Sequence, residues 1–366
     1  MNSYQIARPY IDDSDKSGVL EVLNSGTLAL GPKIVGFEES IAKYTGTKFA
    51  CAVSNGTSGL HLCVKAVGWK AGDEVITSSF SFISSSNCLL FEGVKPVFVD
   101  IDPVTFNMDV DKIEAAITKK TKGILVVHIF GQSADMTKIM QLANKYKLKV
   151  VEDACESLGS SYKSRQTGTI GDAGVFAFYP NKQMTTGEGG MIVTNSKNIY
   201  DQCKSLCNQG RNTQGDWLIH VRLGYNYRLD EMSASLGITQ LKKLDWMIAE
   251  KRKIAELYSK FLANNPGILL PQIAPDRTHS WFVYVIRVES DRRNKLMNYL
   301  AKLGIQTKPY LPVIHLQPFM KKSFGFKEGS YPTAEKIASE TLALPLYIGL
   351  TETDIKYISA QINSFI

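Results

Sequence analysis

Two residues in the middle of the chain have the types and surroundings that covalent cofactor chemistry requires. Asp153 ends an apolar run at 150–152, and Lys182 follows a second run at 174–178. A lysine amine can form a Schiff base with an aldehyde, and a carboxylate can keep a pyridine nitrogen protonated so that the ring accepts electrons. The pair therefore predicts an enzyme that uses pyridoxal 5'-phosphate (PLP), with Lys182 and Asp153 as catalytic residues.

The residues around Lys182 specify the backbone more closely than a surface lysine requires. Pro180-Asn181 precede it, and Thr185-Thr186-Gly187-Glu188-Gly189-Gly190 follow it. Turn-forming residues at this density indicate a loop of fixed shape. A lone lysine commonly only keeps a surface soluble, and an acid at a strand end commonly caps a helix. It is the combination of the two that favours cofactor chemistry.

A phosphate site is expected where residues 55–59 join a predicted strand to a predicted helix. Backbone N–H groups at a helix start, together with the hydroxyls of Thr57 and Ser58, can bind a phosphate. Taken alone, Asn55-Gly56 indicates a turn with Thr57 as the helix cap. Because the segment precedes the Asp153–Lys182 pair, we favour phosphate binding by Gly56, Thr57 and Ser58.

Two other segments hold residues suited to a ring or an anion. Phe82 follows the next predicted strand and could stack on a flat cofactor, although Phe80 and Phe82 together also fit an apolar core. Asn226 and Arg228 precede a long helical pattern, and both residue types bind phosphates. The two tyrosines of that stretch fit simple packing equally well.

Strand-like and helix-like runs alternate, which predicts an α/β fold with a mostly parallel sheet covered by helices. The predicted strands are 49–54, 74–77, 95–100, 123–128, 150–152, 174–178 and 191–194, with one more at 281–288. The predicted helices are 57–67, 82–91, 109–117, 136–146, one long helix from 230 towards 262, 292–303 and two near the C-terminus, the last capped at Thr351. A boundary near residue 246 divides the chain into a large PLP-binding domain (1–246) and a small C-terminal domain (247–366).

Composition excludes several classes of protein. The net charge is +7, without a basic block long enough for a nucleic-acid arm. No apolar run approaches the roughly 20 residues of a membrane span, and the N-terminus lacks the pattern of a secretory signal. Six cysteines occur without a CxxC pair or metal-ligand spacing, which predicts free thiols in a reducing compartment. A cytoplasmic enzyme with no metal, nucleic-acid or membrane partner is expected.

Together these residues resemble the sugar-aminotransferase (DegT/StrS) family of fold-type-I PLP enzymes. The similar motifs follow the family's order along almost the whole chain: Ser25-Gly26-Thr27-Leu28, Ser54-Asn55-Gly56-Thr57, Gly72-Asp73-Glu74-Val75-Ile76, Pro96-Val97-Phe98-Val99-Asp100, His128-Ile129-Phe130-Gly131-Gln132, Glu152-Asp153-Ala154, Thr186-Gly187-Glu188-Gly189-Gly190, Gly224-Tyr225-Asn226-Tyr227-Arg228 and His315-Leu316-Gln317-Pro318. The resemblance implies a large domain with a seven-stranded sheet and a smaller α+β domain. It also implies ping-pong transfer of an amino group from L-glutamate to a nucleotide-linked keto sugar, for polysaccharide, O-antigen or glycan biosynthesis.

The resemblance also implies roles for individual residues. Lys182 would form the Schiff base and later carry protons, and Asp153 would bind the pyridine nitrogen. The other cofactor contacts would be Gly56, Thr57, Ser58, Phe82, Glu156 (near the 3′-oxygen) and Asn226. Asn226 would come from the second subunit, so the active sites would be shared in a homodimer. The substrate contacts would be Thr27, Arg211, Arg228, Tyr310 and His315.

Two positions bear on phosphate binding and on the substrate. Many family members carry Ser where this chain has Ala177, so one phosphate hydroxyl is absent here, and Ser58 or a water is expected to replace it. Many members that aminate carbon 3 of the sugar have Gln where this chain has Glu156. Versions with Glu resemble perosamine-type enzymes, which favours amination at carbon 4 of a 4-keto-6-deoxy sugar nucleotide.

Other functions fit the pattern less well or stay open. Sugar dehydratases of this fold replace the lysine with His, so Lys182 argues against dehydration. A non-enzymatic regulator with this fold would need neither Asp153 nor Lys182 for folding. A dinucleotide-binding dehydrogenase lacks support because the turn after the first strand has no GxGxxG. Amination at carbon 3 and a keto-cyclitol substrate remain alternatives.

Overall fold

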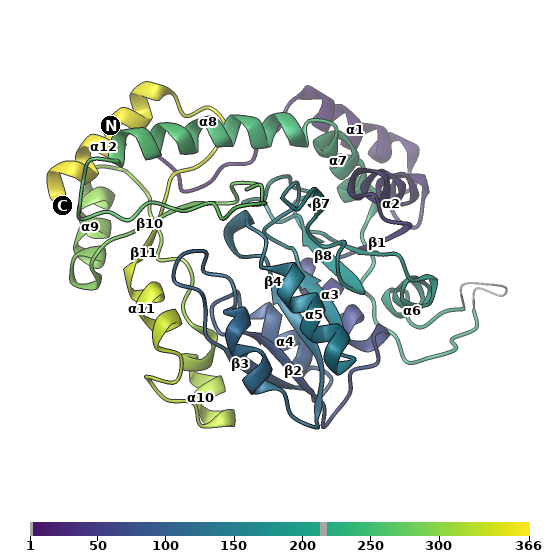
Figure 1. Ribbon diagram of the computed structural model, residues 1–366. Coiled ribbons are helices and arrows are strands. Elements are labelled where there is room, and N and C mark those ends of the chain that lie inside the picture. Colours follow the sequence, from purple (N-terminus) through teal and green to yellow (C-terminus); the bar gives the residue numbers. More distant parts are fainter. Residues whose placement is uncertain (1–2, 213–217) are drawn as a thin grey trace.

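Seven buried strands form the sheet at the centre of the larger domain (Figure 1). The computed structural model describes residues 3–212 and 218–366. The strand order is β1-β9-β8-β5-β4-β2-β3. The bounds are β1 (Phe49–Val53), β2 (Glu74–Ser78), β3 (Lys95–Val99), β4 (Thr121–Val127), β5 (Lys149–Asp153), β8 (Ala173–Ala177) and β9 (Gly190–Thr194). Strands β3, β2, β4, β5 and β8 are parallel, and β9 is antiparallel to both β8 and β1. The seven predicted strands and the predicted α/β fold are confirmed.

Alternation along the strands sends apolar side chains to both faces of this sheet. Leu125 of β4 packs in the cluster that includes side chains of three helices, α3 (Gly56–Ala66), α4 (Ser84–Leu90) and α6 (Lys197–Cys207). Its neighbours Ile124 and Val126 pack with α5 (Met136–Tyr146) on the other face. Helix α2 (Pro32–Thr45) covers the β8–β9–β1 end of the sheet, and a short hairpin, β6 (Ser161–Tyr162) with β7 (Arg165–Gln166), follows β5. Burial on both faces explains why the strands read as nearly continuous apolar runs.

The helical pattern predicted as one long helix from residue 230 is two helices, so that prediction was wrong. Helix α7 spans Glu231–Leu241 and α8 spans Leu244–Leu262. Lys243 leaves the helical conformation between them, with φ −114° and ψ 7°. Its Nζ lies 2.6 Å from Asp12 Oδ2 and 2.7 Å from Asp15 Oδ2, at the start of α1 (Asp13–Ser25). The break is therefore fixed by a distant part of the chain.

A smaller domain forms at the other end of α8, which bridges the two bodies (Figure 1). It contains the antiparallel pair β10 (Tyr284–Arg287) and β11 (Thr341–Leu344) and the helices α9 (Ser290–Lys302), α10 (Pro318–Phe324), α11 (Pro332–Glu340) and α12 (Glu352–Phe365). Three helices follow α9 instead of the two predicted. Thr351 caps α12 as predicted, in a capping box with Asp354. The predicted helix at 109–117 is two 3-10 turns, Val110–Lys112 and Glu114–Ala116.

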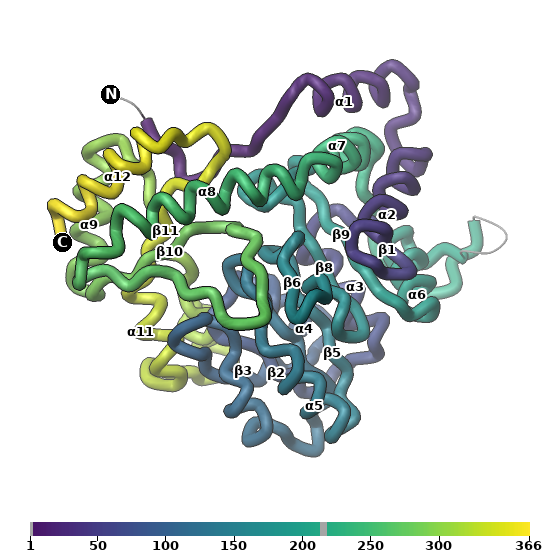
Figure 2. Tube along the Cα trace, turned by 45° about the horizontal axis from the view of Figure 1, so that its top comes forward, coloured from purple at the N-terminus to yellow at the C-terminus, as the bar shows by residue number. Residues whose placement is uncertain are grey.

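The first described residues and the C-terminal helix α12 both lie at the smaller domain (Figure 2). Tyr4 forms a bridge with Ile305, and its hydroxyl donates to Asp354 Oδ1 at 3.0 Å. The first described residues thus pack with the smaller domain, and the predicted boundary at residue 246 falls inside α8. No helix formed by residues 3–212 or 218–366 has the length and apolarity to cross a membrane.

Candidate active site

Asp153 lies at the carboxyl end of β5, between the parallel strands β4 and β8. Its side chain is 6% exposed. The Ser85 hydroxyl donates to Oδ2 at 2.7 Å, and the Cys155 N–H donates to Oδ1 at 3.2 Å. An ionised carboxylate can accept about four hydrogen bonds, so each oxygen keeps capacity for a further donor. The carboxylate is therefore oriented and can still hold a cation.

The loop that carries Lys182 is fixed by its own turn residues, as the sequence predicts. The Thr186 N–H donates to the Phe178 carbonyl at 3.0 Å, and the Thr185 hydroxyl donates to the same carbonyl at 2.9 Å. Gly187 adopts φ +83°, where an L side chain is strained. A Cβ on Gly190 would lie 2.6 Å from the backbone of Asn55, which brings the loop against the start of α3.

The Lys182 amine lies in a confined place between a carboxylate and an aromatic ring. Its Nζ is 3.7 Å from Glu156 Oε1 and 4.1 Å from the centre of the Phe282 ring. Glu156 also accepts the Phe130 N–H at 2.9 Å. Burial raises the pKa of Glu156, and the Lys182 ammonium opposes that rise. The amine can therefore exchange protons inside a site that largely excludes water.

The start of α3 presents free backbone donors beside this pair. Asn55 caps the helix by accepting the Ser58 N–H at 2.8 Å, so the cap is Asn55 instead of Thr57. Within residues 3–212 and 218–366, the N–H groups of Gly56 and Thr57 have no hydrogen-bond acceptor. A Cβ on Gly56 would lie 2.9 Å from both Ala177 Cβ and Cys155 Sγ. The start of α3 thus faces the carboxyl ends of β5, which ends at Asp153, and of β8, which leads into the Lys182 loop.

Aromatic residues border the same region. Phe80 is fully buried, whereas Phe82 is 60% exposed, so the structure separates the two predicted alternatives for these phenylalanines. The Thr57 hydroxyl is 2.7 Å from that of Ser84, which ties the Phe82 segment to the start of α3. The Tyr310 hydroxyl accepts a hydrogen bond from Asn181 Nδ2 at 3.2 Å. Burial raises the pKa of Tyr310, and the Glu156 carboxylate adds to the rise.

Several predicted residues are exposed, or have their side chains bonded to other residues, within one chain. Thr27 is exposed on the loop before α2, and Asn226 is exposed on the segment before α7. Arg228 donates to Asn208 Oδ1 at 3.0 Å, and Arg211 donates to Gln209 Oε1 at 3.2 Å. His315 is fully buried, with Nε2 paired to Glu335 Oε1 at 3.0 Å. Ser58 is buried as well, and its hydroxyl bonds to that of Ser54 at 3.1 Å.

Other residues at the site carry no local signal in the sequence. Phe282 meets Lys182 across 100 residues of chain, and Ser85 meets Asp153 across 68. Gln183 donates to the Glu156 carbonyl and, at 2.8 Å, to Ser280 Oγ. These contacts depend on the tertiary fold, and only a three-dimensional arrangement could reveal them.

A buried lysine lies directly behind the loop. Lys251 falls on the apolar stripe of α8 with Met247, Ile254 and Tyr258, and it is 6% exposed. Its Nζ donates to the Lys182 carbonyl at 3.5 Å. Burial lowers the pKa of Lys251 from 10.5 to about 8, and the Lys182 charge contributes. At neutral pH the folded protein therefore keeps a charge where an apolar group would fit.

We expect Lys251→Met to stabilise the protein. Below about pH 8 Lys251 is charged in both the folded and the unfolded chain. Burial of this charge costs free energy in the folded chain only. Between about pH 8 and 10.5 the unfolded state binds more protons, so wild-type stability rises with pH until the penalty is gone. A shift of this size corresponds to about 3 kcal/mol. Urea unfolding of the cofactor-free protein should show that gain at pH 7 and little of it at pH 10.5.

Lys253→Met is the matched control, because Lys253 lies on the same helix with its side chain 67% exposed. It should leave the free energy of unfolding nearly unchanged at both pH values. A Lys251→Met gain that does not depend on pH would show that packing, and not charge, explains the stabilisation.

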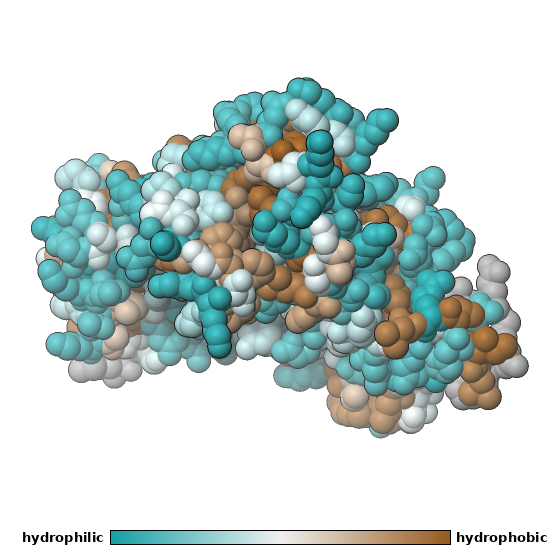
Figure 3. All heavy atoms as spheres, turned by 90° about the horizontal axis from the view of Figure 1, so that it is seen from below, coloured by the Kyte–Doolittle hydropathy of each residue, from teal (hydrophilic) through white to brown (hydrophobic). Residues whose placement is uncertain are grey.

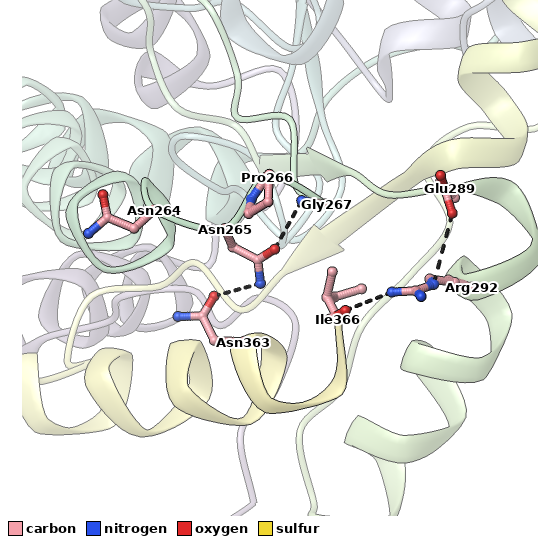
Figure 4. A pocket seen from close by; sticks show the side chains of 8 residues that line it. All are labelled: Asn264, Asn265, Pro266, Gly267, Glu289, Arg292, Asn363 and Ile366. Atoms are coloured by element: carbon pink, nitrogen blue, oxygen red, sulfur yellow. Dashed lines mark hydrogen bonds and ion pairs between the residues drawn. The ribbon is translucent and has the colours of Figure 1, made fainter.

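An open surface pocket lies away from this site. Its volume is about 700 Å³, it lies at the C-terminal end of the smaller domain, and its lining includes Asn265, Arg292 and Ile366 (Figure 4). Arg292 Nη1 donates to the Ile366 oxygen at 2.7 Å. None of the residues predicted for catalysis or binding lines it.

Comparison with known proteins identifies the family of the chain. A model of the DegT/DnrJ/EryC1/StrS aminotransferase family matches residues 9–363. The chain is 36% identical over 367 residues to the GDP-perosamine synthase of Escherichia coli O157:H7, covering 100% of this chain and 99% of that protein. Helicobacter pylori PseC, an aminotransferase involved in the biosynthesis of pseudoaminic acid, has a TM-score of 0.95 at 27% identity, covering 100% of this chain and 99% of that one. Spr1654 of Streptococcus pneumoniae in its PLP form has a TM-score of 0.94 at 26% identity, with 100% and 98% covered. The chain therefore belongs to the DegT/DnrJ/EryC1/StrS family of PLP-dependent aminotransferases.

Proposed function

We propose that this aminotransferase moves the amino group of L-glutamate to carbon 4 of a nucleotide-linked 4-keto-6-deoxyhexose. The observation that carries the proposal is the Lys182 amine beside Glu156, 3.7 Å apart, in the buried corner next to Asp153. Many family members that aminate carbon 3 carry Gln at the position of Glu156, so Glu156 favours carbon 4. The 36% identity to an enzyme named GDP-perosamine synthase also favours a nucleotide-linked sugar.

The residues of the corner fit PLP. The two free N–H groups at the start of α3 suit its phosphate, because a helix N-terminus attracts anions. The buried Asp153 carboxylate suits the ring nitrogen, and the exposed face of Phe82 suits the flat ring. When bound, PLP supplies an aldehyde that takes up the amino group and a ring that accepts electrons.

The protein groups then have separate tasks. Lys182 binds the cofactor covalently between turnovers and moves a proton at the substrate carbon during each half-reaction. Asp153 keeps the ring nitrogen positively charged. Glu156 lies where it can hold or release a proton beside Lys182, and Tyr310 borders the space above them. The fixed loop keeps Lys182 in place while its amine is released, so the same residue serves both half-reactions.

The proposal includes a homodimer with shared active sites. The arm at residues 218–223 extends away from the body of the larger domain (Figure 1) and exposes Leu218, Ile219, Val221 and Leu223. Figure 3 shows this apolar surface beside the residues drawn in grey. An apolar, projecting arm is typical of a segment that packs on a second copy. Asn226, at the base of the arm, is then free to contact the cofactor phosphate of the partner.

Cations near the arm suit the diphosphate of the second substrate. Arg211 borders a depression of about 400 Å³, in which Lys197 is paired with Asp201 and Lys204 with Glu38. Arg228 lies on the segment that enters α7. We infer that Arg211 and Arg228 contribute to binding of the sugar nucleotide, and that Thr27 contributes from the loop before α2.

A product assay tests the proposed reaction. With PLP and L-glutamate, we expect the protein to convert at least one of the UDP-, GDP- and dTDP-linked 4-keto-6-deoxyhexoses to an amine, and to form 2-oxoglutarate in equal amount. Mass spectrometry detects the amine and NMR locates it on the sugar ring. Lys182→Ala serves as the inactive control. An amine on carbon 3, or turnover of a keto-cyclitol alone, would contradict amination at carbon 4.

A further inference from the structure

Three consecutive serines at the start of α4 have three different partners. Ser84 Oγ lies 2.7 Å from Thr57 Oγ1, and Ser86 Oγ donates to the Ile83 carbonyl at 3.0 Å. Ser85 instead donates to Asp153 Oδ2 at 2.7 Å, and its Oγ lies 2.7 Å from Ser81 Oγ. Ser85 is fully buried and Ser81 is 4% exposed. Two buried hydroxyls therefore lead to the carboxylate that the cofactor's ring nitrogen is expected to meet.

The protons of this chain of groups have one possible order. An ionised carboxylate only accepts hydrogen bonds, so the single proton of Ser85 points to Asp153. Ser81 must then donate to Ser85. Hydrogen bonds to a charged group are shorter and stronger than neutral ones, and successive bonds polarise each other where water is excluded. Both hydroxyl dipoles thus stabilise the negative charge on Asp153.

We propose that Ser85, supported by Ser81, is a positioning residue that fixes the Asp153 carboxylate and holds its negative charge for the pyridine nitrogen of PLP. The inference rests on the proposed role of Asp153. Without the Ser85 hydroxyl the carboxylate could turn about its side-chain bonds, because its remaining donors are weaker. The Cys155 N–H lies 3.2 Å away, and the Cys155 thiol beside it is a weak donor. The nearby thiols of Cys88 and Cys155 supply no opposite charge, and burial raises the pKa of both.

The consequence reaches the cofactor through a shared proton. Loss of a hydrogen-bond donor makes the negative charge on the Asp153 carboxylate less stable. The proton shared between Asp153 and the ring nitrogen then lies more on Asp153 and less on the nitrogen. A positive ring nitrogen disfavours a second positive charge on the linkage between the cofactor and Lys182. Loss of Ser85 should therefore move the pH midpoint of the visible absorbance band of the PLP-loaded protein to higher pH.

Ser85→Ala, Ser81→Ala and the neighbouring Ser86→Ala form the test series. We expect Ser85→Ala to weaken PLP binding about tenfold, as for loss of a hydrogen bond to a charged group, and to raise the pH midpoint. Ser81→Ala should change both in the same direction but less. Ser86→Ala should change neither, since its hydroxyl contacts only a backbone carbonyl. Ser85→Thr keeps the hydroxyl and should restore most of the affinity.

The readouts are the PLP dissociation constant, the pH titration of the band and the melting temperature of the cofactor-free protein. A Ser85→Ala variant that melts earlier but binds PLP and titrates like wild type would show a purely structural serine and overturn the proposal. Equal effects of Ser85→Ala and Ser86→Ala would overturn it too. Absence of a visible band in the wild-type protein with PLP would instead reject the assignment of Lys182 and Asp153, which separates the two failures.

Discussion

Lys182→Ala removes the covalent bond between the protein and PLP. The substitution deletes the only amine within reach of Glu156 Oε1 among the described residues and leaves the fixed loop intact. A positioned proton carrier contributes about 10²–10⁴-fold to a rate. We therefore expect the half-reaction with L-glutamate to slow by at least about 10²-fold. Borohydride reduction followed by peptide mass spectrometry locates the bound cofactor, and stopped-flow absorbance gives the rate.

Lys251→Met is the matched control for this experiment. Lys251 is the buried lysine nearest in structure to the loop, donating to the carbonyl of Lys182. Its replacement should leave PLP attached to the peptide that carries Lys182. If the Lys182→Ala protein still traps PLP on reduction, another lysine holds the cofactor, and Lys251 is the first to examine.

The sequence predicts the sheet well because its signal is local. Most residues of the seven strands are buried, and apolar runs of four to eight residues between turn residues are sufficient to identify such strands. The Lys182 loop is predictable for a similar reason, since Thr185, Thr186 and Gly187 close their turns within a few residues. Asp153 at the end of β5 follows from the strand itself.

The predictions fail where a distant residue decides the local structure. Apolar residues continue at helical spacing through Leu241 and Leu244, so the sequence indicates one helix. The break depends on Lys243 binding Asp12 and Asp15, some 230 residues earlier. Helix α1 was missed because only Asp15 and Val22 are buried along it, which leaves almost no apolar periodicity to detect.

In the candidate site, too, the residues with a local sequence signal are predicted and those fixed by distant contacts are not. Lys182, Asp153, Glu156 and Gly56 lie in motifs whose neighbours fix the backbone, and the structure places them together. His315 was expected to face the sugar, yet its side chain is fully buried against Glu335. A histidine in a short motif gives no information on the direction of its ring, which depends here on a helix that begins 17 residues later.

Asp153→Asn should slow the half-reaction with L-glutamate by about 10²–10⁴-fold while PLP still attaches to Lys182. Asparagine keeps the shape of the side chain and can still accept from Ser85, but it cannot balance a positive ring nitrogen. Loss of one partner of a buried ion pair costs about 3–5 kcal/mol, and each 1.36 kcal/mol is tenfold in rate. Single-turnover absorbance with saturating PLP separates this rate from any loss of cofactor affinity.

A cofactor with a permanent ring charge shows whether charge is the cause. A PLP analogue methylated on the ring nitrogen stays positive without help from the protein. With this analogue, the rates of the half-reaction with L-glutamate in Asp153→Asn and in wild type should therefore lie closer together, provided that both proteins bind the analogue. The analogue should not speed the half-reaction of Lys182→Ala, because that variant lacks the amine. If Asp153→Asn reacts within about tenfold of wild type, the buried carboxylate serves the fold of β5. In that case the hydrogen bonds from Ser85 and Cys155 hold a strand end, and the electron-accepting ring must be charged in another way.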